Sequence, residues 1–190
     1  MDFKWIEIVK KYEDKNIKYL DELQNMGYLK NELAPVRGTP INLSDLYRWD
    51  FTDYIMYLIA ADLEINIDEV EVYRYLTGYN GDDIDSIKEN IEERDIMSYD
   101  FQSKIPVSLK LMIIATNKLV REVPDADWSF YFKLYLLSFI YAGRVIMCAD
   151  ECVSYKERRN FEVYIKNLIA YIDENSYVRF REPLTNLLLN

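Results

Sequence analysis

Two short stretches of the 190-residue chain repeat one arrangement of acidic and small polar residues. The first runs from Ala61 to Glu69 and the second from Ala149 to Glu157, and both fit Ala-Asp-x-x-[Ile/Val]-[Asn/Ser]-x-x-Glu. The offset is 88 residues for the aspartates (150 − 62) and for the glutamates (157 − 69). Carboxylates are the ligands that hard divalent cations such as Ca²⁺, Mg²⁺ or Mn²⁺ prefer. Both stretches therefore carry side chains of the kind that could ligate such a cation.

The second half of each stretch predicts the start of a helix. Asn66 with Glu69, and Ser154 with Glu157, have the spacing of a capping box, in which the cap side chain and the glutamate each accept a backbone N–H. The apolar residue before each cap, expected to form a hydrophobic staple, is Ile65 or Val153.

The aspartates are less easily explained by local structure. Asp62 and Asp150 are expected near the C-terminal ends of helices, where a carboxylate is unfavourable by about 0.3 to 1 kcal/mol. A bound cation or a neighbouring basic side chain would offset this. If the two stretches form a pseudo-twofold pair, the carboxylates of Asp62 and Asp150, with those of Glu64 and Glu151 and with loop carbonyls, are expected to converge on one ion. Two interpretations stay open: helix caps with solvated acids, or metal ligands.

The composition excludes several kinds of chemistry. The chain has no histidine, so Ser-His-Asp and Cys-His catalysis and histidine-ligated zinc or haem are ruled out. The two cysteines, Cys148 and Cys152, are too few for a structural zinc site, and we expect them to be reduced and partly buried.

The charge balance indicates the kind of partner. With 33 acidic and 23 basic residues, the net charge of −10 disfavours nucleic acid and favours cations or a basic protein partner. One local basic cluster, formed by Lys156, Arg158 and Arg159, is expected to be a solvated helix face.

Apolar residues recur at helical spacing along the whole chain, which predicts an all-α bundle. Each acidic stretch follows an apolar helix and opens an amphipathic one, and Phe51 and Phe139 share the offset of the repeat. Buried packing, rather than a stacking surface, is expected for Tyr54, Tyr57, Tyr131, Tyr135 and Tyr141. The expected helices cover about 2–26 with one break near 14–16, 44–61 capped by Ser44 or Asp45, 67–76, 82–94, 106–119, 127–149 and 154–171.

Three regions are expected. Residues 1–43 form an N-terminal helical extension and a loop rich in Pro and Gly, 44–176 form a bundle with two pseudo-repeated antiparallel helix pairs, and 177–190 form a tail or short docking helix. The apolar stretch 130–149 is interrupted by Lys133 and Arg144, which favours a buried core helix over a membrane span. The N-terminus has no signal-peptide pattern, and a cytoplasmic protein is expected.

The repeated stretch resembles the TerB-like family, helical domains named after a tellurite-resistance protein. Its pattern, Ala-Asp-Gly-x-[Ile/Val]-[Ser/Thr]-x-x-Glu, is similar to both stretches, and the resemblance covers about Trp49 to Tyr171. The family glycine is replaced by Leu63 and Glu151, so the easy left-handed turn is lost. The resemblance implies a non-enzymatic module linked to stress responses, metal sensing or membrane-associated chaperone systems. Carried over to this chain, it gives Asp62, Glu69, Asp150 and Glu157 as the candidate metal ligands.

Two other functions are considered. An acidic immunity-type or inhibitor protein that covers a basic partner fits the charge. An enzyme using carboxylates and a metal would need acid pairs on inward helix faces, which the sequence does not show, so we expect no enzymatic activity.

Overall fold

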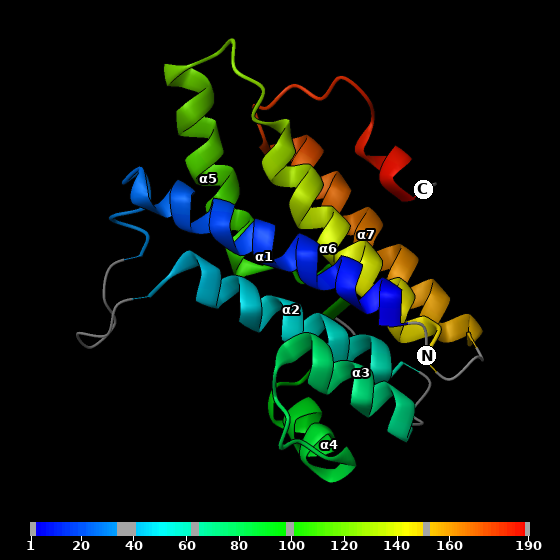
Figure 1. Cartoon of the computed structure of the whole chain (residues 1–190). Coiled ribbons are helices and arrows are strands. Elements are labelled where there is room, and N and C mark those ends of the chain that lie inside the picture. The colour runs from blue at the N-terminus through cyan, green and yellow to red at the C-terminus, as the bar shows by residue number, and fades with distance from the viewer. Residues whose placement is uncertain (1–2, 34–40, 62–64, 98–100, 150–152, 189–190) are drawn as a thin grey trace.

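The computed structural model describes residues 3–33, 41–61, 65–97, 101–149 and 153–188, and these form helices with no strand among them (Figure 1). The all-α prediction is confirmed. In chain order the elements are α1 (Phe3–Asn25), α2 (Leu43–Ile59), α3 (Ile67–Thr77), α4 (Ile84–Glu93), η1 (Phe101–Ser103), α5 (Val107–Glu122), α6 (Ser129–Met147), α7 (Tyr155–Asn175) and η2 (Leu184–Leu188).

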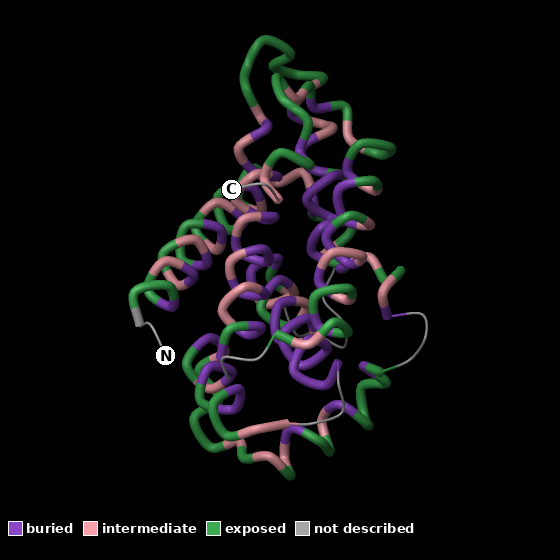
Figure 2. Tube along the Cα trace, turned by 90° about the vertical axis from the view of Figure 1, so that its right-hand side faces the viewer, coloured by how far each residue is buried: buried purple, intermediate pink, exposed green. Residues whose placement is uncertain are grey.

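Helix α6 lies at the centre of the bundle. It contacts α1, α2, α3, α7 and η2, and apolar residues cover most of its circumference, as expected for a helix with neighbours on every side. Figure 2 shows buried positions gathered in the interior helices and exposed positions on the outer turns.

By length and composition, α6 is the one helix in the described part of the chain that could cross a membrane. In its most apolar stretch of 18 residues, 61% is buried inside the protein. Because its neighbours already cover this apolar surface, a core role accounts for its composition.

Helix α1, expected as part of an extension, lies along α6 and also contacts α2, α3 and α5 (Figure 1). Its buried stripe is formed by Ile6, Val9, Leu20 and Leu23. The expected break near residues 14–16 is wrong: α1 is continuous from Phe3 to Asn25. One reason is that Asn16 is buried rather than placed in a solvated turn.

Several predicted helix boundaries are confirmed. Asp83 caps α4 by accepting the backbone N–H of Ser86, and α3 ends at Gly78, whose positive φ of 80° a side chain would oppose. The start of α2 differs: the helix begins at Leu43, before both expected caps. The Leu43 N–H donates instead to Oε1 of Gln24 (2.6 Å), so the cap comes from the end of α1.

α2 with α3, and α6 with α7, form two pairs of contacting helices. α3 turns back along α2, and α7 turns back along α6, with contacts within each pair (Figure 1). α2 and α6 contact each other, so the first helices of the two pairs meet in the core. The C-terminal η2 docks on α6 and α7, while α4 lies against α2.

Candidate functional site

The joint between α2 and α3 contains the first predicted capping box. The Glu69 N–H donates to Asn66 Oδ1 and the Asn66 N–H donates to Glu69 Oε2, both at 3.0 Å. The Glu69 side chain is almost completely buried, with 2% of the residue exposed.

The joint between α6 and α7 contains the second box. The Glu157 N–H donates to Ser154 Oγ at 3.1 Å, and the Ser154 N–H donates to Glu157 Oε2 at 2.7 Å. Glu157 is also 2% exposed. The predicted capping boxes are therefore confirmed at both joints, and both glutamates have a structural task.

The helix ends around the two joints match in detail. α2 ends at Ile59 and α6 at Met147, while α3 begins at Ile67 and α7 at Tyr155, so both boundaries shift by 88 residues (147 − 59 and 155 − 67). The Ala60 N–H donates to the Met56 carbonyl, and the Cys148 N–H donates to the Arg144 carbonyl at the same offset. The same local geometry therefore occurs twice.

The expected staples differ between the joints. Ile65 packs partly buried against the core, and the residue after Glu69, Val70, is fully buried. Val153 is 48% exposed, because the residue in the corresponding position of α7 is Arg158, which offers no apolar partner. The cap expected at Ser154 is therefore confirmed, but the staple expected at Val153 is wrong.

Only part of the predicted metal site falls within the described residues. Glu69 and Glu157 each give one carboxylate oxygen to their own cap. Asp62 and Asp150 lie outside the described residues, as do Glu64 and Glu151. In the part of the chain that the structure describes, no group of three or more Asp, Glu, Cys or His side chains is arranged to hold a metal ion. Convergence of the carboxylates of Asp62, Asp150, Glu64 and Glu151 on one ion stays a prediction.

The cysteines are placed in part. Cys152 lies outside the described residues, while Cys148 is a free thiol at the C-terminal cap of α6. The expectation of a partly buried side chain is wrong for Cys148, which is exposed because it follows the last buried turn of α6.

Aromatic residues at the offset of the repeat meet where α2 crosses α6. The ring centroids of Phe51 and Phe139 are 5.4 Å apart, and those of Tyr47 and Tyr135 are 5.5 Å apart, both with edge-to-face geometry. Within each helix the tyrosine stacks on the phenylalanine, at 5.7 Å in α2 and 5.0 Å in α6. The sequence also repeats Leu-Tyr at 46–47 and 134–135, a signal that could have revealed the second pair.

A buried polar network accompanies this crossing. The Tyr47 hydroxyl donates to Ser138 Oγ at 2.9 Å, while Tyr135 shares a 2.9 Å hydrogen bond with Ser108 Oγ. Ser108 Oγ in turn donates to Asp50 Oδ2 at 2.6 Å. Asp50 and Ser138 are also separated by 88 residues (138 − 50). Tyr47 of α2 therefore bonds directly to Ser138 of α6, and Tyr135 of α6 is linked through Ser108 to Asp50 of α2.

Asp50 also caps a distant helix. Its carboxylate accepts the backbone N–H groups of Val107 (3.3 Å) and Ser108 (2.8 Å) at the start of α5. The residue before α5 is Pro106, which has no side-chain acceptor, so the cap must come from elsewhere. Burial raises the pKa of Asp50, although its hydrogen bonds with Ser108 and Val107 act in the opposite direction.

The predicted tyrosines are mostly core residues. Tyr54, Tyr57, Tyr131 and Tyr135 are buried, whereas Tyr141 is partly exposed and stacks with Tyr12 of α1.

Comparison of the chain with protein-family models, with curated proteins and with solved structures gave no match.

Proposed function

We propose that the protein is a non-enzymatic, TerB-like binding and sensing module of a stress-response system. Its two related helix pairs present acidic joints that bind a divalent cation, Ca²⁺, Mg²⁺ or Mn²⁺. The ligands at these joints are Asp62, Glu69, Asp150 and Glu157.

The observation that carries this proposal is the agreement between the two joints. Both have a capping box with a glutamate that is 2% exposed, and both follow helices that end and restart at the same offset. Contacts between Tyr47 and Tyr135 and between Phe51 and Phe139 also support a duplicated unit, because a pseudo-twofold arrangement would bring residues at equal offset together.

The electrostatics of the joints favour a cation. Each joint follows a helix C-terminus, where backbone carbonyls already present partial negative charge. Each sequence then adds an aspartate, whose charge is unfavourable at that position. A hard divalent ion offsets this charge, and its binding fixes the joint and couples the two helix pairs.

Calorimetric and thermal-melting titrations with CaCl₂, MgCl₂ and MnCl₂ test the proposal. We expect heat of binding and a higher melting temperature for the native protein. The double variant Asp62→Asn/Asp150→Asn should lose both effects, whereas Asp125→Asn, at an exposed turn, should keep them.

A second double variant separates capping from binding. Glutamine can replace glutamate in a capping box, so Glu69→Gln/Glu157→Gln removes the charge and retains the cap. We expect a folded protein with weakened cation binding. The absence of heat and of a melting shift at millimolar cation in the native protein would contradict the metal part of the proposal.

The exposed face of α4 favours a second candidate function, an immunity-type or inhibitor protein that binds a basic partner. This short helix carries four exposed carboxylates against one exposed lysine: Asp85, Glu89, Glu92 and Glu93 against Lys88. A pull-down repeated at high salt, with a Glu89→Lys/Glu93→Lys variant as control, tests it. A basic partner that is retained by the native chain and lost with salt or with the variant supports this function.

A further inference from the structure

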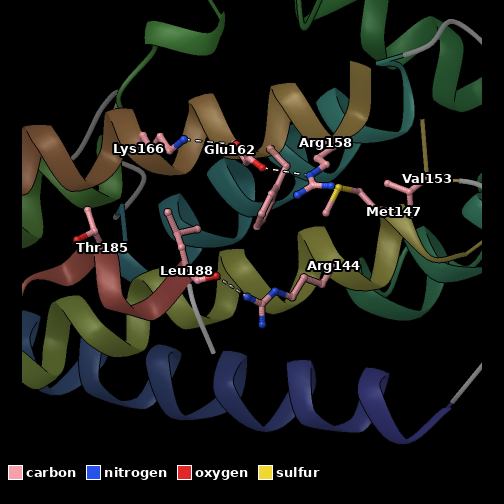
Figure 3. Close-up of a pocket in the computed structure, with 9 residues that line it drawn as sticks. Arg144, Met147, Val153, Arg158, Glu162, Lys166, Thr185 and Leu188 are labelled. Atoms are coloured by element: carbon pink, nitrogen blue, oxygen red, sulfur yellow. Dashed lines mark hydrogen bonds and ion pairs between the residues drawn. The ribbon is translucent and has the colours of Figure 1, made fainter. Parts of the chain in front are cut away.

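A groove of about 690 Å³ runs between α6, α7 and η2 (Figure 3). Its apolar lining comes from Met147, Val153, Phe161 and Leu188. Its volume falls within the usual range of small-molecule sites.

The charge of the groove is opposite to that of the chain. Among the described residues, three cationic side chains line it, Arg144 from α6 and Arg158 and Lys166 from α7, with one carboxylate, Glu162. In a chain with a net charge of −10, this places a local excess of positive charge around an apolar surface. An anion is the complementary occupant.

Both guanidinium groups are already oriented. Arg144 Nη2 donates to the Leu188 carbonyl at 3.0 Å, and its guanidinium lies 5.9 Å from the Tyr141 ring centre. Arg158 Nε donates to Glu162 Oε1 at 3.2 Å, and its two Nη groups have no hydrogen-bond partner among the described residues. A pair of Nη groups of this kind binds a carboxylate or phosphate in a forked geometry.

Glu162 competes with an entering anion for the cationic side chains of the groove. It bonds to Arg158 and also to Lys166 Nζ at 3.4 Å, and these hydrogen bonds hold the pKa of its carboxyl below the usual value. Glu162 therefore occupies part of the positive potential that an entering anion would use. Removing its charge should strengthen anion binding, an effect that a purely structural ion-pair network would not produce.

We propose that this groove binds a small amphipathic anion, a carboxylate attached to an aliphatic body. The carboxylate pairs with the Nη groups of Arg158 and with Arg144, and the aliphatic part covers Met147, Phe161 and Leu188. The proposal is separate from the cation site, since it depends on the basic residues of α6 and α7 and not on the acidic joints.

The test uses decanoate below its micelle concentration, with calorimetry and backbone-amide NMR shift mapping on the full chain. We expect saturable binding, with shifts centred on the facing sides of α6, α7 and η2. Acetate, which lacks the aliphatic body, and decyltrimethylammonium, which reverses the charge, should bind at least about tenfold more weakly, a ratio equivalent to about 1.4 kcal/mol.

Three variants test the roles of the charges. Arg158→Gln should weaken decanoate binding about tenfold, and Glu162→Gln should strengthen it by about threefold or more. Arg179→Gln, an exposed arginine of the C-terminal segment that does not line the groove, should leave it unchanged. Because the Arg158 side chain is 72% exposed, its replacement is expected to leave the fold intact.

Several outcomes would overturn the proposal. These are no saturable binding of decanoate, equal binding of the cationic amphiphile, shifts centred on another face, or equal binding by the Arg158 and Glu162 variants. The Asp62→Asn/Asp150→Asn variant should still bind decanoate, so failure of the cation site and failure of this groove are distinguishable.

Discussion

The two helix pairs share a joint but differ on their outer surfaces. Arg144 and Arg158 line an open groove on α6 and α7, whereas the residues at the same offset in α2 and α3 are Met56 and Val70, both fully buried. The offset is 88 residues in each case (144 − 56 and 158 − 70).

The first pair is covered by its own chain. The Tyr73 hydroxyl donates to Asp82 Oδ2 at 3.0 Å, and Arg74 donates to the Asp82 carbonyl, so the segment that leads to α4 lies over α3. In the second pair, η2 covers only one end of the corresponding surface (Figure 3). The two pairs therefore have similar capping boxes, while only α6 and α7, among the described residues of the two pairs, line an open groove with basic side chains.

The largest expected effect tests the equivalence of the pairs at their crossing. Phe51→Ala and Phe139→Ala should each lower the free energy of unfolding by about 3 to 5 kcal/mol, because each removes a buried ring. Since the rings touch, the double variant should be non-additive by at least about 0.5 kcal/mol.

Urea unfolding followed by circular dichroism measures these values. Phe180→Ala, which removes a partly buried ring outside the crossing, is the matched control and should cost less. Strict additivity of Phe51→Ala and Phe139→Ala would show that the two pairs are not energetically coupled at this point.

The next effect concerns an interaction that α2 has and α6 lacks. Asp50→Ala should cost about 2 to 3 kcal/mol, because it leaves the first N–H groups of α5 and the Ser108 hydroxyl without their acceptor. Asp50→Asn, which keeps one acceptor oxygen, should cost about 1 kcal/mol.

The difference in stability between the native protein and Asp50→Asn is expected to depend on pH with a defined sign. Burial raises the pKa of Asp50 in the folded state, so protonation of Asp50 favours folding. That contribution is complete below the unfolded pKa and is lost as the pH rises through the folded pKa. The stability of the native protein relative to Asp50→Asn should therefore increase as the pH falls from neutral towards about 4. A constant or decreasing difference would refute the assigned direction.

A smaller effect is expected at the close approach of α6 to α2 and α7. A Cβ at Gly143 would lie 2.6 Å from Phe161 Cδ2 and closer still to the Tyr54 hydroxyl oxygen. Gly143→Ala should cost about 1 to 2 kcal/mol, the steric strain being partly offset by the higher helix propensity of alanine.

Tyr54→Phe provides the second arm of this test. The Tyr54 hydroxyl is buried and has no hydrogen-bond partner within the described residues, so its removal should be close to neutral. Combined with Gly143→Ala, it should recover part of the lost stability, as measured by thermal unfolding. The absence of any recovery would show that the clash with Phe161 alone determines the cost.

The smallest expected effect compares the two capping boxes directly. Asn66→Ala and Ser154→Ala should each lower the free energy of unfolding by about 1 kcal/mol, since each leaves one N–H of the first turn without its side-chain acceptor. Urea unfolding midpoints measure this loss of stability, provided that the dependence of the unfolding free energy on urea concentration is the same in all variants. A loss at one joint only would mean that the joints are alike in sequence but not in energetics.

The sequence predicted those parts of the molecule that depend on neighbours in the chain. The capping boxes at Asn66 and Ser154, the Asp83 cap and the Gly78 stop all involve residues within one helical turn. Their side chains can reach the relevant backbone groups in any tertiary context, so local spacing is sufficient. Phe51 and Phe139 were also found from the constant offset, although their contact could not be.

Residues that act across the fold were missed. Lys156, Arg158 and Arg159 are exposed, as the sequence predicted, but nothing in the sequence indicates that Arg144 lies across a groove from Arg158. The residue types and the spacing of the sequence identified the carboxylates at the acidic joints. Whether they converge on one ion depends on how the α2–α3 and α6–α7 pairs approach each other.

The sequence by itself determined the all-α class, the repeated joint and the local caps, because helical periodicity and first-turn hydrogen bonds are short-range. Only the tertiary structure decided the caps of α2 and α5, which come from Gln24 and Asp50 on other helices. It also decided which pair keeps an open groove. Both follow from tertiary packing. Packing of the whole bundle determines which side chains lie next to a helix end or a groove, and the distance along the chain does not.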